Sequence, residues 1–215
     1  MTNLEKAVGS NEIFKKLGKE ADKKAVQKVL DEIAEDVLAK LKSEDIINHT
    51  VQVYDETVEE YAKAHTQIIP ELLDFMAMLS NGARVLDIGC GPGRDAFFMS
   101  VCDADFRKKF MGKIKSGISV LQELHLSEKI FRVYGIDRST EMLQYARKRA
   151  VELKKSGLLT STTCPLFDFE EMHDYPDDYS SHSDFDGIWS CASLFTHTPK
   201  PLIEPALASV SLCLK

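Results

Sequence analysis

The apolar positions of the chain follow two different periods. Up to Leu79 they recur every three to four residues, the spacing of amphipathic helices, first over Ala25–Leu41 and then over Tyr54–Leu79 with an interruption at Pro70. From Ala83 onward, short apolar runs alternate with helical stretches. The change of period predicts N-terminal helices followed by a region in which strands and helices alternate.

Four short apolar runs of the second region are predicted strands. They cover Val85–Ile88, Phe131–Asp137, Thr162–Phe169, which is the weakest, and Asp186–Ser190. The first two lead into helices at Arg94 and after Ser139, and a last helix begins near Pro201. Pro205 is assigned to the first turn of that helix, where backbone N–H groups have no partner within the helix. The alternation implies a parallel sheet covered by helices on both faces.

The composition is that of a globular protein, and it limits the classes of partner that the chain is expected to bind. Of the 215 residues, 44% are hydrophobic and 28% are charged, which suits a folded domain with an attached segment. The net charge of -7 argues against a phosphate-neutralising surface, so nucleic acid is not an expected partner. Neither a long apolar run nor a signal-peptide pattern occurs, so a cytoplasmic protein without a membrane partner is expected. The five cysteines include no C-x-x-C pair, so neither a disulfide framework nor a metal site is predicted.

The strongest chemical signal is the glycine-rich segment Val85–Asp95, which reads VLDIGCGPGRD. Its alternate glycines permit positive φ and let a ligand lie against the backbone where a strand turns into a helix. A dinucleotide-binding loop, G-x-G-x-x-G, would have its third glycine where this chain has Arg94. Its ribose-binding acid would follow after about 20 residues, whereas Asp137 lies much further along. Both departures disfavour a dinucleotide.

Three segments in order carry a resemblance to a known family. The D-x-G-x-G-x-G pattern of Asp87–Gly93 resembles motif I of the class I S-adenosylmethionine-dependent methyltransferases. The segment Arg132–Leu143 is similar to the second strand of that family, its acidic end and the helix that follows, and Phe185–Leu194 is similar to motif IV. Motif IV looks closest to small-molecule methyltransferases of the tellurite-resistance type, in which it continues as S-L-L-H-x-P. Here Ser193–Pro199 is one residue longer.

The resemblance, which runs from about Tyr54 to the end of the chain, implies a Rossmann-like class I methyltransferase fold. Residues 1–45 would form an N-terminal helical extension, and residues 46–215 a methyltransferase domain with a helical insertion at about 102–130. About four strands of the parallel sheet are expected, with the C-terminal strands missing. The fourth strand would then be an exposed edge, open to self-association or a partner chain. The alternative is a truncated, non-catalytic cofactor-binding or interaction protein of the same fold.

The resemblance implies S-adenosylmethionine as cofactor and a small molecule as methyl acceptor. The residues expected at the methionyl part of the cofactor belong to the glycine loop: Asp87 near the ammonium, then Gly89, Cys90, Gly91 and Gly93. Asp137 would accept both ribose hydroxyls, and Arg138 or Met142 would flank the adenine. Asp168 and Phe169 look like the pair that grips the adenine edge after the third strand, with Glu170 as a competing choice for the acid. Ser190 and Cys191 would lie beside the sulfonium.

Methyl transfer from a sulfonium is a direct displacement and requires no nucleophile on the protein. A general base is needed only where the acceptor must lose a proton. His197, just past the fourth predicted strand, is the candidate base, although it could instead cap the next helix or shape the pocket. Tyr54 and Tyr61 lie on a helix that folds over the cofactor in relatives, so they are expected to pack in the core or the lid, with contacts to the substrate as the alternative.

Overall fold

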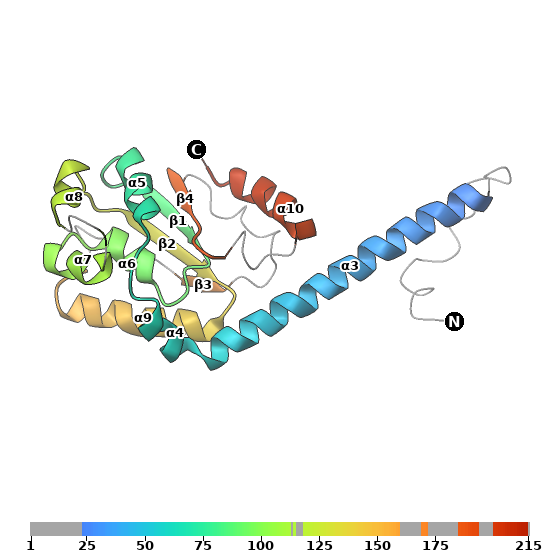
Figure 1. Ribbon diagram of the computed structural model, residues 1–215, viewed down its shortest axis with the longest axis horizontal. Coiled ribbons are helices and arrows are strands. Elements are labelled where there is room, and N and C mark those ends of the chain that lie inside the picture. Colours follow the sequence, from blue (N-terminus) through green and yellow to red (C-terminus); the bar gives the residue numbers. More distant parts are fainter. Residues whose placement is uncertain are drawn as a thin grey trace. The chain divides into compact units, whose positions relative to one another are not determined.

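The computed structural model describes residues 23–112, 114, 118–159, 169–171, 185–193 and 200–214 (Figure 1). By its internal contacts the chain divides into Met1–Glu44 and Asp45–Lys215. Helix α3 (Lys23–Glu56) begins in the first unit and ends in the second. It contains the first predicted helix. The second predicted helix is broken between α4 (Val58–Ala64) and α5 (Pro70–Met78), where Pro70 occupies the first helical position.

A four-stranded parallel sheet lies in the second unit, with the order β3-β2-β1-β4. Strands β1 (Arg84–Ile88), β2 (Arg132–Asp137) and β4 (Gly187–Trp189) confirm three of the predicted strands. The described part of the third strand, β3 (Phe169–Glu171), begins where the predicted run ends. Its register pairs Gly135 with Phe169 and Asp137 with Glu171, so Phe169 lies inside the strand and not after it.

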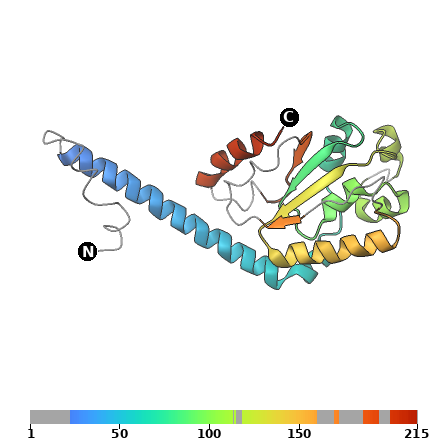
Figure 2. The same cartoon turned by 180° about the vertical axis from the view of Figure 1, so that it is seen from behind.

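Helices cover both faces of the sheet, as the alternating pattern predicts (Figures 1 and 2). Side chains of one face, including Val85 and Val133, pack in a core with α5, α6 (Arg94–Ser100) and α9 (Thr140–Lys155). Leu86 and Ile136 point to the other face, where α10 (Lys200–Ser211) contributes Val210. Successive residues of a strand alternate between faces, so each strand anchors two layers.

The last helix departs from the sequence prediction at Pro205. Because α10 begins at Lys200, Pro205 is its sixth residue and lies inside the helix, not in its first turn. A proline there removes one internal hydrogen bond. Beyond the helix, Leu214 forms a single parallel bridge with Phe185, whose N–H donates to the carbonyl of Cys213 at 3.0 Å. Among the described residues β4 itself pairs only with β1.

The segment between α6 and β2 is helical, as predicted, with α7 (Ala104–Met111) and α8 (Ile118–Glu123). Arg107 of α7 binds this segment to the core. It is a charged residue, yet only 1% of it is exposed. Its guanidinium donates to the backbone carbonyls of Phe98 at 3.2 Å, Leu126 at 2.5 Å and Lys129 at 2.7 Å. The buried cation therefore ties α6, α7 and the turn after α8 together.

Replacing Arg107 by methionine is expected to lower the free energy of unfolding by about 3 kcal/mol or more, because buried carbonyls lose a charged donor. Urea denaturation measures the loss. Lys108→Met changes the exposed neighbour in the same helix and should stay within about 0.5 kcal/mol of the wild type. Equal losses in the two variants would contradict the structural role of Arg107.

Candidate functional site

An open hollow lies at the carboxyl end of β1. This end of a parallel sheet is where open α/β folds bind ligands. The residues that line the hollow come from α4 and its end, from β1 and the glycine loop, from α6 and from the segment after β4: Tyr61, His65, Asp87, Gly89, Cys90, Gly91, Pro92, Arg94, Asp95 and Cys191. The structure thus brings Asp87 and most of the predicted glycine loop into one concave site.

The three glycines of the loop all have positive φ, at 69° for Gly89, 53° for Gly91 and 81° for Gly93. A Cβ at Gly89 would lie 2.2 Å from the Cβ of Ser193, and one at Gly93 would lie 2.5 Å from the ring of Phe97. These two positions exclude a side chain by packing as well as by backbone conformation. A Cβ at Gly91 would only approach Tyr61, at 4.0 Å, so Gly91 borders the open hollow.

Asp137 joins the end of β2 to the glycine loop. Its Oδ2 accepts a hydrogen bond from the N–H of Gly91 at 2.8 Å, and its Oδ1 accepts one from the N–H of Ser139 at 2.9 Å. Burial raises the pKa of this carboxyl, and the backbone donors oppose that shift. The side chain is therefore held in one orientation next to the loop, and the N–H of Gly91 is satisfied.

Asp87 has the unsatisfied oxygen of the site. Only 2% of the residue is exposed, and its Oδ2 has no hydrogen-bond partner among the described residues. Burial and the negative charge of Asp95 raise its pKa well above the usual range, while Arg94 opposes the shift. A buried polar atom without a partner is costly, so a cationic or hydrogen-bond-donating ligand group in the hollow would fit it.

Arg94 and Asp95 form a partly buried ion pair at the start of α6, with Nε–Oδ1 at 2.6 Å and Nη2–Oδ2 at 2.8 Å. Burial opposes the charged form of Arg94, but the hydrogen bonds and charge of Asp95 outweigh it and raise the pKa of the guanidinium. Trp189 donates from Nε1 to Asp95 at 2.9 Å, and Arg94 also lies 3.4 Å from the Sγ of Cys191. The pair thereby links α6 to the end of β4.

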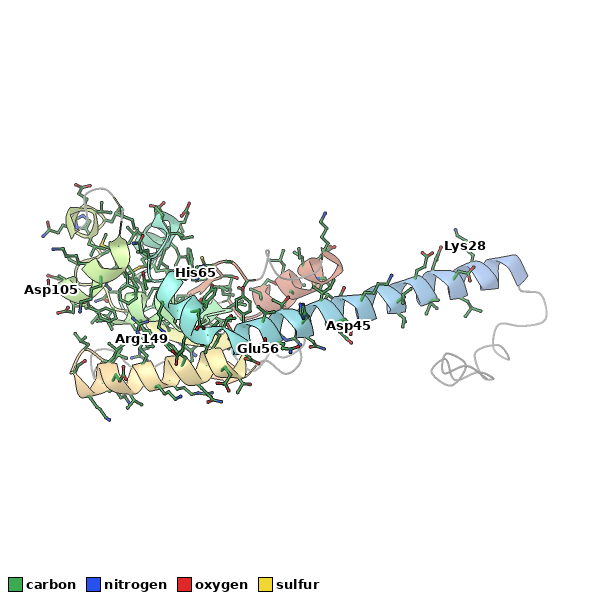
Figure 3. All side chains as sticks on the ribbon, turned by 60° about the horizontal axis from the view of Figure 1, so that its bottom comes forward. Lys28, Asp45, Glu56, His65, Asp105 and Arg149 are labelled. Carbon is green, nitrogen blue, oxygen red and sulfur yellow. The ribbon has the colours of Figure 1, made fainter. Side chains whose placement is uncertain are left out.

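Three aromatic rings lie in series beside the loop. Tyr54 and Tyr61 meet edge to face, with centroids 5.3 Å apart. Tyr61 stacks on His65, which is labelled in Figure 3, at 4.1 Å. The Nδ1 of His65 lies 3.1 Å from the carbonyl oxygen of Tyr61. A carbonyl can only accept, so Nδ1 carries the hydrogen and Nε2 is the acceptor of the neutral ring. The pKa of Tyr61 is raised, mainly by burial.

The other predicted site residues have the following places. Gly93 precedes α6 as its N-cap, and Met142 is buried in the first turn of α9. Arg138 is half-buried after β2, and the Oγ of Ser190 lies 2.7 Å from the Oγ of Ser193. Burial raises the pKa of the Cys90 thiol well above its usual range, so it is not a reactive thiolate. Asp168 and His197 lie outside the described residues, as does the side chain of Phe169.

Sequence reasoning missed several residues of the site. The sequence pattern did not single out His65, although its position four residues after Tyr61 places both on one helix face. Trp189 packs against the core as a partly buried ring and also donates to Asp95. That contact joins residues 94 positions apart, so no local pattern could indicate it.

Within the part of the chain that the structure describes, no helix is long and apolar enough to cross a membrane. The same residues contain no group of three or more His, Cys, Asp or Glu side chains arranged to hold a metal ion.

The sheet order, the glycine loop after β1 and the acidic residue at the end of β2 define a Rossmann-like cofactor-binding domain. A family model described as a methyltransferase domain matches residues 79–204. The chain therefore belongs to the methyltransferase domain family. This membership confirms the predicted methyltransferase family and its Rossmann-like fold, and S-adenosylmethionine is the cofactor that it implies. The tellurite-resistance subgroup remains a prediction.

Solved structures of methyltransferases are similar to the chain at low identity. A TehB-like enzyme from Corynebacterium glutamicum is 22% identical, with a TM-score of 0.43, over 78% of this chain and 68% of that one. Two enzymes crystallised with S-adenosylhomocysteine are each 18% identical, with TM-scores of 0.40. That from Thiobacillus denitrificans aligns over 74% of this chain and 49% of its own, and that from Geobacter sulfurreducens over 75% and 51%. The chain thus spans about half the length of the last two. No curated protein matches the sequence.

Proposed function

We propose that this chain catalyses methyl transfer from S-adenosylmethionine to a small-molecule acceptor by direct displacement. The observation that carries the proposal is the juxtaposition, at one sheet edge, of the orphaned Asp87 oxygen, the glycine loop and the tethered Asp137 carboxylate. When bound, the cofactor supplies an electrophilic methyl group on a sulfonium. The acidic composition supports a small acceptor over nucleic acid.

Each part of the cofactor has a matching group in this chain. The Asp87 carboxylate would bind the ammonium, and the charged Arg94 guanidinium would bind the carboxylate. Asp137 would accept the ribose hydroxyls while keeping its backbone donors, since each carboxylate oxygen can accept two hydrogen bonds. The open backbone at Gly91 leaves room for a ligand below Tyr61.

The protein has to align the acceptor and exclude water, and a base is required only if the acceptor carries a proton that must leave. His197 remains the base that the sequence predicts. Among the described residues, His65 also lines the hollow, with Nδ1 held by the Tyr61 carbonyl and Nε2 left to accept. Tyr61, stacked on it, would cover the glycine loop.

The raised pKa of Asp87 predicts a pH dependence of binding. A ligand ammonium favours the ionised carboxylate, so S-adenosylhomocysteine should release a proton on binding below that pKa, and its affinity should rise with pH through it. Methylthioadenosine lacks the amino-acid part and shares only the dependence on Asp137. Titration of both ligands across pH measures the difference, which should disappear in Asp87→Asn.

Asp87→Asn should also melt at a higher temperature than the wild type at neutral pH without ligand. A carboxyl whose pKa is raised by folding contributes stability below the pKa of the unfolded chain and loses it as the pH rises through the folded value. The asparagine carries no charge to bury. A lower melting temperature, or an unchanged pH dependence of S-adenosylhomocysteine binding, would contradict the role of Asp87.

Turnover tests the proposed activity directly. The protein is incubated with S-adenosylmethionine and a panel of small thiols, amines, phenols and carboxylic acids, and formation of S-adenosylhomocysteine is measured. Turnover on a panel member that is lost in Asp137→Ala supports the proposal. Binding of the cofactor without turnover on any acceptor would favour the alternative of a non-catalytic cofactor-binding protein.

A further inference from the structure

Asp55, in the last turn of α3, contacts the start of α9. Its Oδ1 accepts a hydrogen bond from the Oγ of Ser139 at 2.5 Å and a longer one from the N–H of Glu141 at 3.3 Å. Figure 3 shows the end of α3, marked by Glu56, next to this helix. A carboxylate at the first turn of a helix is favoured by the unpaired N–H groups there. Asp55 therefore acts as a capping group supplied from a distant part of the chain.

Ser139 passes this contact on to the proposed ribose-binding residue. Only 1% of Ser139 is exposed, and its Oγ also accepts from the N–H of Met142 at 3.1 Å. Its own N–H donates to the Oδ1 of Asp137, and the Oδ2 of Asp137 accepts from Gly91. An unbroken chain of hydrogen bonds thus runs from α3 through the turn after β2 to the glycine loop.

The hydroxyl of Ser139 has a single hydrogen, so the acceptor of its hydrogen bond decides how the hydroxyl is oriented. With that hydrogen on Asp55, the lone pairs of Oγ face the N–H of Met142, and the turn that contains Asp137 is fixed from both sides. Without Asp55 the buried hydroxyl loses a charged acceptor, and the turn keeps only its bonds to the sheet and the loop.

We infer that Asp55 is a positioning residue that orients Asp137 for the cofactor ribose and couples the end of α3 to cofactor binding. The inference rests on the proposed function, because it assigns Asp137 to the ribose. Coupling is reciprocal, so a ligand that binds better when Asp55 is docked must also stabilise the docked state. Asp55 touches neither the cofactor nor the acceptor in this account.

Calorimetry of three variants tests the inference. Asp55→Ala should weaken S-adenosylhomocysteine and methylthioadenosine by the same factor, about tenfold, because both ligands share the ribose. Asp55→Asn keeps an oxygen that can accept from Ser139 and should restore most of the affinity. Glu56→Ala is the matched control, since Glu56 is exposed and its carboxylate accepts from Gln52 of the same helix. It should bind both ligands as the wild type does.

Hydrogen exchange gives a second measurement that a merely stabilising residue would not affect. S-adenosylhomocysteine should slow amide exchange over residues 45–56 in the wild type, and much less in Asp55→Ala. An unchanged affinity in Asp55→Ala, or wild-type exchange over 45–56 that does not respond to the ligand, overturns the inference. The exchange measurement on the wild type tests the inference even if the alanine variant does not fold. No binding by the wild type would overturn the proposed function, and this inference with it.

Discussion

Replacing Gly89 by alanine is expected to abolish cofactor binding and to destabilise the fold. The new Cβ would lie 2.2 Å from the Cβ of Ser193 and 2.5 Å from its Oγ, at a φ of 69° that disfavours any side chain. Ser193 cannot move freely, because its Oγ donates to the carbonyl of Ile88 at 2.6 Å. The loop must therefore shift away from the sheet edge. We expect a loss of about 3 kcal/mol in the free energy of unfolding and at least about a hundredfold in affinity for S-adenosylhomocysteine.

Gly82→Ala is the matched control for this variant. Gly82 has a φ of 81°, but a Cβ there would meet no atom within 4 Å. Its free energy of unfolding should therefore fall by about 1 kcal/mol, the cost of a side chain at positive φ. The variant should bind S-adenosylhomocysteine as the wild type does. Urea denaturation and calorimetry measure both quantities. Equal losses of stability and affinity in the two variants would show that the contact with Ser193 does not shape the loop.

Asp137→Ala is expected to weaken S-adenosylhomocysteine and methylthioadenosine by at least about a hundredfold, because the ribose loses a charged acceptor. The N–H groups of Gly91 and Ser139 also lose their acceptor, so the glycine loop and the turn after β2 are no longer tied together. Calorimetry with the two ligands measures the effect. Asp137→Asn keeps an oxygen for one of these donors and should lose less.

Asp186→Ala provides the control for Asp137→Ala. Asp186 also accepts a backbone hydrogen bond, from the N–H of Arg84 at 2.8 Å, at the opposite end of β1. Its removal should lower stability and leave the ligand affinities within about threefold of the wild type. A similar result for Asp137→Ala would refute its assignment to the ribose.

Local patterns predicted the part of the fold that carries the glycine loop. The run before Gly89 is apolar and short, and the residues from Arg94 have helical spacing, so β1 and α6 follow from the sequence. Ser139 precedes the helical pattern of α9 and caps it, as its residue type indicates. The end of the third strand was placed at Phe169, whereas the described strand runs to Glu171, because its weak run offers no sharp end in the sequence.

Local sequence patterns did not predict the contacts between distant segments. Asp55 and Ser139 are 84 positions apart, and nothing in the sequence around either residue indicates the other. The orphaned oxygen of Asp87 was likewise visible only in the packed structure, although the motif predicted a carboxylate near the ammonium. The motif thus predicted that Asp87 and the glycine loop lie together at one site. The structure adds what orients them.

A calorimetric titration of the wild-type protein with S-adenosylhomocysteine, methylthioadenosine and NAD tests the central claim most directly. The account predicts that one S-adenosylhomocysteine binds per chain and that methylthioadenosine binds more weakly, because it lacks the groups assigned to Asp87 and Arg94. It predicts no binding of NAD. Absence of heat with S-adenosylhomocysteine, or tighter binding of NAD, would contradict the assignment of this site to S-adenosylmethionine.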